Sequence, residues 1–336
     1  MRYVTFVVST PLGASTRVGC LTLAGDIIDL NLAYRSMLSE KVGPNRATAI
    51  ADAMVPNDLI QLLANGPLGR EAVAAALQSL SSDEPGTRTG DDDAVLVHAR
   101  SDVRLLSPLP RPTSLRDCSA YELHLHNSTR GQIPPRWYDS PTYYKGNPAS
   151  VIGDRTDVPL PAGARKCDYE LEYAAVIGKT GRDLDAVTAL DHIAGYLVFN
   201  DVSLRSVQFR EMSVGLGPAK SKDLDGTNIL GPALVTPDEW DPHEDRIMRA
   251  FVNGEEWSSG LTTSIHFSVG EILSHISQAE GLHVGDVIGT GTVGGGSGLE
   301  VGRYPESGDT VTLDIEGLGQ LSNTWGTTAS ATLVTE

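Results

Sequence analysis

The first part of the chain alternates short apolar runs with turns, and helical periodicity then takes over. Three runs have the length and β-branched content of strands: YVTFVVS, VGCLTLAG and DIIDL. Apolar residues recur at helical spacing around residues 31–40, 46–64 and 69–80. The pattern therefore predicts a small α+β domain at this end.

A polar stretch divides the sequence. Residues 81–93, SSDEPGTRTGDDD, contain no apolar side chain and read as a solvated linker or loop. The prolines of residues 105–115, LLSPLPRPTSL, predict an extended lead into the next domain. We expect two domains, residues 1–93 with the linker and residues 94–336.

Beyond Asp117 the pattern is mainly that of strands separated by Gly, Pro and Asp-rich turns. The candidate strands are ELEYAAVIG, HIAGYLVFNDVS, GPALVTP, RIMRAFVNGEEW, GDVIGTGTV and GDTVTLDIEGLG. A helical period is convincing only near residues 185–193 and 267–279. The predicted fold class is mainly β with α, with a larger β-rich roll or sandwich and no internal repeat.

Composition narrows the class of partner. The 336 residues carry a formal net charge of −17, which repels a phosphate backbone and argues against nucleic acid. No segment has the apolar length of a membrane span, and the short apolar start reads better as a strand than as a secretory signal. The three cysteines, Cys20, Cys118 and Cys167, suggest neither a disulfide framework nor a zinc site. We expect a cytoplasmic protein with reduced thiols.

The stretch DYELEYAAVIGK places two acids next to an apolar run. In a strand, Glu170 and Glu172 share one face, while Tyr169, Leu171 and Tyr173 share the other. A solvated strand face would give the same spacing. On spacing alone, the pair is therefore either a polar surface or part of a site.

Other candidate motifs are weak by themselves. GTGTVG, residues 289–294, matches a dinucleotide fingerprint formally, but glycines and a proline follow where that fingerprint needs a helix. A glycine-rich loop through which the backbone approaches a ligand remains open. Asp201 at the end of GYLVFND, the His124 and His126 pair, and Lys222 each have an ordinary structural explanation in isolation.

Taken together and in order, these fragments resemble the fumarylacetoacetate hydrolase family. The matching segments are RDCSAYELH, DYELEYAAVIGK, GYLVFNDVSLRSVQ, GLGPAKSKDLDGTNILGPALVT, GDVIGTGTVGGGSGLE and GDTVTLDIEGLGQLSN. They cover residues 117–323, and several independent motifs in the correct order make the resemblance specific.

The resemblance implies a divalent-cation site. The family's ligand positions correspond here to Asp117, Glu170, Glu172 and Asp201. Four carboxylates form the all-oxygen shell that Mg²⁺, Ca²⁺ or Mn²⁺ prefers. Because they also leave excess negative charge, nearby cations are expected, and Arg205 and Lys222 would supply them.

The resemblance also implies the other site residues. His124 matches a histidine that activates water, and Glu300 matches the late glutamate that orients it, whereas a shorter branch has a glutamate at the position of Asn127. Lys222 would stabilise an enolate, and it is favoured over Lys220. The expected substrate-binding residues are Tyr144, Arg205, Gln208 and Thr292.

Two positions depart from the family pattern. Ser206 replaces a common aspartate and Ser119 replaces a tyrosine, and the segment between Lys222 and the following GP is longer than usual. These changes lie where substrates differ. They bear on the substrate more than on the metal site.

The resemblance implies a metal-dependent hydrolase that cleaves a carbon–carbon bond in β-diketone acids such as fumarylacetoacetate or acylpyruvates, in the breakdown of aromatic compounds. A keto-acid decarboxylase, hydratase or isomerase on the same metal platform is the first alternative. The second is a non-catalytic homologue that only binds metal or ligand. The family further implies a homodimer built through the β-rich domain.

Overall fold

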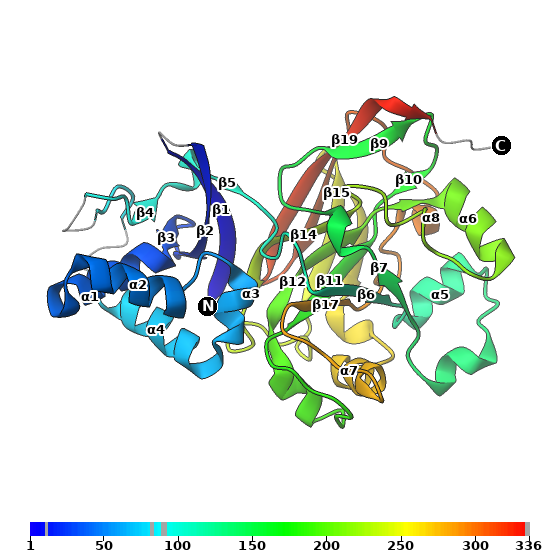
Figure 1. Cartoon of the computed structure of the whole chain (residues 1–336). Coiled ribbons are helices and arrows are strands. Elements are labelled where there is room, and N and C mark those ends of the chain that lie inside the picture. The colour runs from blue at the N-terminus through cyan, green and yellow to red at the C-terminus, as the bar shows by residue number, and fades with distance from the viewer. Residues whose placement is uncertain (11–12, 81–83, 89–92, 333–336) are drawn as a thin grey trace.

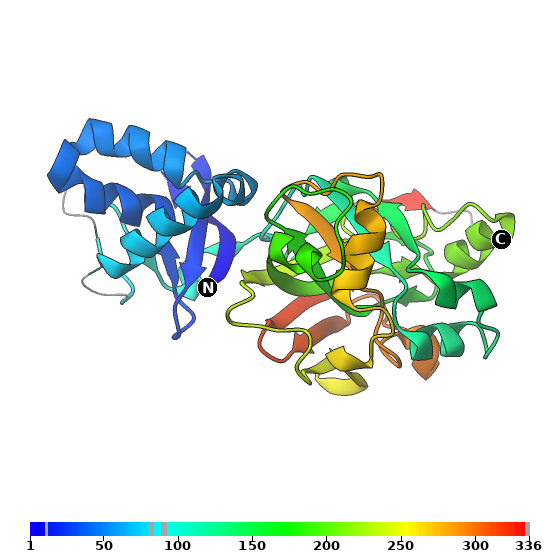
Figure 2. The same cartoon turned by 90° about the horizontal axis from the view of Figure 1, so that it is seen from below.

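The computed structural model describes residues 1–10, 13–80, 84–88 and 93–332, the last six of these by backbone alone. Residues 81–83 and 89–92 of the expected linker lie outside this description. In both views the N-terminal strands and helices stand beside a larger body of strands (Figures 1 and 2).

The N-terminal part follows the predicted order of strands and helices. Its elements are β1 Arg2–Thr10, β2 Gly13–Leu21, β3 Ile27–Asp29, α1 Leu30–Val42, α2 Pro44–Met54, α3 Leu59–Ala64, α4 Gly66–Gln78, β4 Val97–His98 and β5 Arg104–Leu105. The single helix expected over residues 46–64 is wrong, because α2 ends before Pro56 and Asp58 caps a new helix by accepting from Gln61 N.

The larger part is rich in strands, as predicted. The strands are β6 Ser114–Cys118, β7 Tyr143–Gly146, β8 Val151–Ile152, β9 Val158–Ala162, β10 Cys167–Asp168, β11 Leu171–Ile177, β12 Ile193–Asp201, β13 Ser203–Leu204, β14 Asn228–Val235, β15 Ile247–Val252, β16 Glu255–Leu261, β17 Asp286–Gly289, β18 Thr310–Ile315 and β19 Gly319–Thr332. The helices are α5 Glu122–Ser128, α6 Arg205–Val214, α7 Val269–Ser277 and α8 Gly298–Val301.

The helix expectations for this part are partly wrong. The expected helix over residues 267–279 is confirmed as α7, but residues 185–193 form only a 3-10 turn, Thr188–His192. Helices α5, α6 and α8 are not indicated by the pattern. They are short, and most of their side chains lie at least partly in solvent, so none shows an apolar stripe of helical period.

A mixed sheet runs through the whole molecule in the order β4-β3-β2-β1-β14-β12-β11-β17-β6-β7. A second sheet, β16-β15-β18-β19-β9, and the pair β10-β13 complete the larger part. Strand β11 is buried on both faces: Tyr173 and Ile177 pack into the main core, whereas Ala174 and Val176 pack towards the N-terminal part. Glu170 and Glu172 share the latter face, further back along the chain.

Candidate active site

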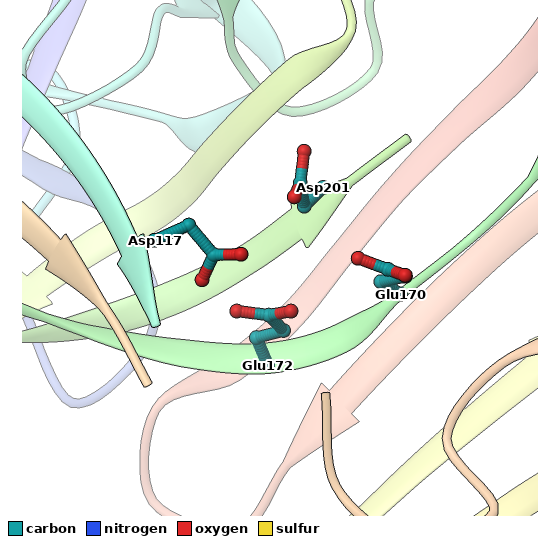
Figure 3. A group of neighbouring side chains, drawn as sticks. All are labelled: Asp117, Glu170, Glu172 and Asp201. Atoms are coloured by element: carbon teal, nitrogen blue, oxygen red, sulfur yellow. The ribbon is translucent and has the colours of Figure 1, made fainter. Parts of the chain in front are cut away.

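Four carboxylates meet at the end of the central strands (Figure 3). Asp117 comes from β6, Glu172 from β11, Glu170 from the residue before that strand begins, and Asp201 from the end of β12. One oxygen of each lies within 4.8 Å of the others, and all four side chains are buried. The solvated-face alternative for Glu170 and Glu172 is therefore wrong.

Strand pairing brings these segments together. Strand β17 lies between β11 and β6 in the sheet, and Gly289 of β17 is the register partner of Asp117. A Cβ atom on Gly289 would lie 2.5 Å from Asp117 Oδ1 and 2.8 Å from the Phe199 ring. A glycine is thus required where the carboxylate crosses its neighbouring strand.

Two buried cations border the cluster. Lys222 Nζ lies 2.5 Å from Glu170 Oε2 and also donates to Asp201 Oδ2. Arg205 Nη1 lies 2.7 Å from Glu170 Oε1. Lys220, the alternative considered from sequence, is exposed.

The carboxylates outnumber these cations, and the pKa values reflect it. Burial raises the pKa of Glu172 well above its usual range, and the charges of Asp117 and Glu170 raise it further. Burial would also raise the pKa of Glu170, but Lys222 and Arg205 lower it to about 2. Burial alone would lower the pKa of Lys222, yet Asp201 and Glu170 raise it, so the ammonium keeps its proton.

The donor set fits a hard divalent cation. Asp117 Oδ1 and Asp201 Oδ1 are buried, and neither has a hydrogen-bond partner among the described residues. Unpaired buried oxygens of this kind are costly unless a cation satisfies them. Four carboxylates also match the all-oxygen preference of Mg²⁺, Ca²⁺ and Mn²⁺.

A histidine–carboxylate pair lies at the side of this cluster. His124 on α5 places Nδ1 2.8 Å from Glu300 Oε2 on α8. Proximity to His124 contributes to the low pKa of Glu170, after the larger effects of burial, Lys222 and Arg205. The neighbouring His126 is exposed and approaches Asn127 Oδ1 at 3.4 Å.

Glu300 is held in place by several donors. Besides His124, it accepts from Gly295 N at 2.8 Å, Ser297 Oγ at 2.9 Å and Asn127 Nδ2 at 3.0 Å. Burial would raise the pKa of Glu300, but the contact with His124 and these hydrogen bonds lower it. A fixed anion at Nδ1 selects the imidazole tautomer that leaves Nε2 free to accept a proton.

The expected substrate-binding residues also gather here. Tyr144 OH donates to Asp201 Oδ2 at 3.0 Å, and Thr292 Oγ1 donates to Glu172 Oε1 at 3.0 Å. Gln208 Oε1 accepts from Arg205 Nη1 at 2.8 Å. Every residue predicted for the site therefore touches another member of it.

The two departing positions lie at the margin. Ser206 Oγ donates to the Arg165 carbonyl at 3.2 Å, and the Ser119 carbonyl accepts from Trp137 Nε1 at 2.8 Å. The glycine-rich segment that begins with GTGTVG supplies backbone donors to the site. Gly291 N donates to Glu172 in the metal cluster, and Gly295 N, directly after GTGTVG, donates to Glu300 beside His124.

Two further carboxylates support the site and were missed from sequence. Glu211 on α6 accepts from Ala219 N, Lys220 N and Ser221 N, at 3.1, 2.7 and 3.1 Å, which ties down the loop that carries Lys222. Asp168 accepts hydrogen bonds from the Arg205 guanidinium and from two backbone amides of α8. Asp168 is the first residue of the DYELEY motif. Its hydrogen-bond partners are distant in sequence, and no sequence pattern predicts these contacts.

Comparison with known proteins decides the family. The profile described as fumarylacetoacetate (FAA) hydrolase C-terminal matches residues 114–325. The chain belongs to the fumarylacetoacetate hydrolase family. A relative in the family, oxaloacetate tautomerase YisK of Bacillus subtilis, is 31% identical over 81% of this chain and 87% of its own.

Solved structures show that the family fold extends over nearly the whole chain. Fumarylacetoacetate hydrolase EaFAH from psychrophilic Exiguobacterium antarcticum is similar with a TM-score of 0.70 and 26% identity, covering 97% of this chain and 100% of its own. Maleylpyruvate hydrolase from Sphingobium sp. SYK-6, solved with manganese(II) and pyruvate, shares the fold at a TM-score of 0.68 and 22% identity, covering 97% and 99%. The predicted family and fold class are thus confirmed.

The described parts of the chain contain no helix long and apolar enough to cross a bilayer. Cys20, Cys118 and Cys167 are all free and buried.

Proposed function

We propose that this protein is a divalent-metal-dependent hydrolase that cleaves a carbon–carbon bond in β-diketone acids, with acylpyruvates and fumarylacetoacetate as the substrate class. The observation that carries the proposal is the His124–Glu300 contact of 2.8 Å beside a buried four-carboxylate cluster. Such a pair can deprotonate water, and the cluster could hold a cation that polarises the keto oxygens of the substrate.

Asp117, Glu170, Glu172 and Asp201 would hold the cation, as Mg²⁺, Ca²⁺ or Mn²⁺. When bound, it would polarise the keto oxygens of the substrate and offset negative charge that develops on them. All other steps fall to the chain's own side chains.

His124 Nε2 takes a proton from water, while Glu300 stabilises the resulting imidazolium through Nδ1. The hydroxide attacks the carbonyl carbon at one end of the scissile bond. When that bond breaks, its electron pair stays on the neighbouring carbon, and the leaving fragment becomes an enolate. Return of the proton from His124 to that carbon completes two carboxylic products.

Positive charge at Lys222 would stabilise the enolate, and four residues would orient the substrate: Tyr144, Arg205, Gln208 and Thr292. Arg205 Nη2 supports this role, because it is buried with no hydrogen-bond partner among the described residues. A substrate carboxylate is the natural acceptor for such a guanidinium.

We also propose that the protein works as a cytoplasmic homodimer on a small keto acid, without nucleic acid or membrane partners. The net charge of −17 supports the exclusion of nucleic acid.

An oxygen-labelling assay tests the reaction. The purified protein, freed of metal by chelation and supplied with Mn²⁺, Mg²⁺ or Ca²⁺, is incubated in H₂¹⁸O with acylpyruvates, fumarylacetoacetate and oxaloacetate. Hydrolysis should yield two carboxylic products, with one ¹⁸O in the acid released from the attacked carbonyl. Release of carbon dioxide would instead indicate decarboxylation, and no turnover of any substrate would favour a binding protein.

Oxaloacetate tautomerisation is the second candidate, because the relative named oxaloacetate tautomerase aligns over 81% of this chain. In that reaction His124 would remove a proton from the carbon next to the keto group, a proton would be added to the keto oxygen to give the enol, and no water would be consumed. Faster equilibration of the keto and enol forms, with no carbon–carbon bond broken, would select this candidate over hydrolysis.

A further inference from the structure

Asp168 is a fully buried carboxylate that lies between the metal cluster and the His124–Glu300 pair. It belongs to the short strand β10, which pairs with β13 next to Arg205. Its exposed fraction is 0%, and its two oxygens face three donors from distant parts of the chain. These donors are Arg205 Nε at 2.7 Å, Gly298 N at 2.7 Å and Leu299 N at 2.9 Å.

Arg205 connects Asp168 to the metal cluster, and the two backbone amides connect it to the His124–Glu300 pair. Arg205, held through Nε by Asp168, reaches Glu170 Oε1 through Nη1 at 2.7 Å. Gly298 and Leu299 form the first turn of α8, and Glu300 follows them directly. Glu300 in turn orients His124. One carboxylate therefore contacts both the arginine beside the metal cluster and the helix that carries Glu300.

The contact with α8 is close enough to require a glycine. A Cβ atom at position 298 would lie 2.5 Å from Asp168 Oδ1 and 2.2 Å from the Arg303 carbonyl oxygen. With glycine there, the backbone of α8 comes to full hydrogen-bond distance from the carboxylate. A helix of four residues has little stability of its own, so such outside contacts fix its position.

We propose that Asp168 is a positioning residue that sets the place of Glu300, and through it of His124, relative to the metal cluster. The proposal rests on the proposed function in that His124 and Glu300 act as its dyad. Asp168 itself makes no contact with the reacting atoms. Its effect arises because a displacement of about 1 Å in a catalytic group can cost on the order of a hundredfold in rate.

The chain offers a matched control. Asp154 is also buried, and it likewise accepts from a backbone amide, Ser322 N at 3.0 Å, and from an arginine, Arg100 Nη2 at 3.1 Å. Neither partner belongs to the site. Asp168→Asn and Asp154→Asn each replace a buried anion by an isosteric amide, so both should lower the melting temperature.

Only Asp168→Asn should lower the catalytic rate. At a Mn²⁺ concentration that saturates each variant, we expect kcat to fall about tenfold or more with KM changed less than threefold. Asp154→Asn should keep kcat within about twofold. Equal kcat losses in the two variants would show that Asp168 contributes only to folding.

A double-mutant cycle tests the route through Glu300. If Asp168 acts by placing Glu300, then Asp168→Asn combined with Glu300→Gln should lose little more kcat than the worse single variant. Losses that multiply would mean independent roles and would overturn the proposal.

Hydrogen exchange gives a readout that needs no turnover. Peptides covering residues 297–303 should exchange faster in Asp168→Asn and at the wild-type rate in Asp154→Asn. If Asp168→Asn does not fold, Leu299→Pro removes the amide that reaches Asp168 Oδ2, and proline is tolerated in a first helical turn. That variant should show the same exchange and the same kcat loss.

The two proposals fail separately. Wild-type protein that converts no keto acid would reject the proposed function, while the exchange experiment would still decide whether Asp168 holds α8. Wild-type turnover with unchanged exchange over residues 297–303 in both Asp168→Asn and Leu299→Pro would reject the positioning role alone.

Discussion

At the scale of single residues, Glu172 combines full burial with three carboxylate neighbours. It accepts hydrogen bonds from Gly291 N and Thr292 Oγ1, both at 3.0 Å, and its exposed fraction is 0%. These donors offset part of the cost of burying the anion, but they do not remove the repulsion from Asp117 and Glu170. The Glu172 carboxylate thus destabilises the metal-free protein, and it has a favourable interaction partner when a cation is bound.

Glu172→Gln should separate these two effects. Because the amide removes the repulsion and can still bond Gly291 and Thr292, the metal-free variant should melt at or above the wild-type temperature. Added Mn²⁺ should stabilise the wild type, by about 2.7 kcal/mol at a hundred times Kd, and the variant much less. Thermal melts with and without Mn²⁺ measure both quantities.

The exposed Glu256→Gln serves as the control and should retain the Mn²⁺ effect. A wild-type shift in the Glu172→Gln protein would show that the cation binds elsewhere.

The two histidines of α5 should differ sharply. His124 faces Glu300, whereas His126 is exposed. Loss of a positioned general base typically lowers the rate by about 10²–10⁴, so His124→Ala should reduce kcat by roughly a hundredfold or more. Mn²⁺ binding, measured by titration calorimetry, should remain.

Glu300→Gln should have a milder effect than His124→Ala, and His126→Ala should be close to neutral. An essential His126 with a dispensable His124 would require both the dyad and the hydrolytic mechanism to be withdrawn.

At the scale of elements, α6 supports the site from both of its ends. Its first residue is Arg205, and Glu211 near its other end receives three successive amides of the loop before Lys222. Several hydrogen bonds also explain why the pKa of Glu211 is lowered although burial would raise it. The helix thereby fixes both cations of the cluster.

Glu211→Ala should loosen this loop without touching the carboxylates. We expect faster hydrogen exchange over residues 219–222 and a several-fold loss of kcat, because Lys222 is less well placed. Exchange by mass spectrometry and steady-state kinetics check the two parts. The exposed glutamate of α1, changed as Glu40→Ala, should alter neither, and a Glu211→Ala protein that matches it would refute the support role.

Elements with a strong period could be predicted, and short ones could not. Strands β1, β11, β12 and β18 and helix α7 place apolar residues in the hydrophobic core at regular spacing. That spacing can be recognised in the sequence. Helix α5 buries none of its seven residues, and α8 has four residues, so contacts made elsewhere in the fold decide their structure.

The same distinction holds for the site. Asp117, Glu170, Glu172 and Asp201 sit in motifs that local spacing and family resemblance pick out, and the structure brings them together. Asp168 and Glu211 could not be found this way. Their function depends on amides at positions 298–299 and 219–221, which any residue type except proline provides.

At the scale of the whole molecule, the N-terminal part is joined to the rest by more than its linker. Strand β1 pairs with β14 at Arg2 and Tyr3, and the second core cluster combines Leu30 and Leu59 with Leu197 and Leu230. The N-terminal helices thus cover apolar residues on the face of the sheet that also carries the metal cluster. A domain boundary at residue 93 remains a prediction.

The proposed homodimer gives a direct test at this scale. Light scattering at micromolar concentration should report about twice the 35.7 kDa of one chain, with or without Mn²⁺. A mass near 35.7 kDa would refute the dimer. The catalytic assignments would stand, because every site residue named above comes from one chain.

The pairing of β6 with β17 has a consequence for how the protein reaches its native state. Glu170, Glu172 and Asp201 belong to β11, β12 and their edges, which are close along the chain and can assemble early. Asp117 joins them only after β6 has found β17 in parallel register, which requires a long and entropically expensive loop to close. A cation that needs all four oxygens therefore binds only chains that have completed this closure. During refolding it should leave the early collapse unchanged and slow the reopening of the finished sheet, so that metal supply governs how long the native state lasts more than how quickly it forms.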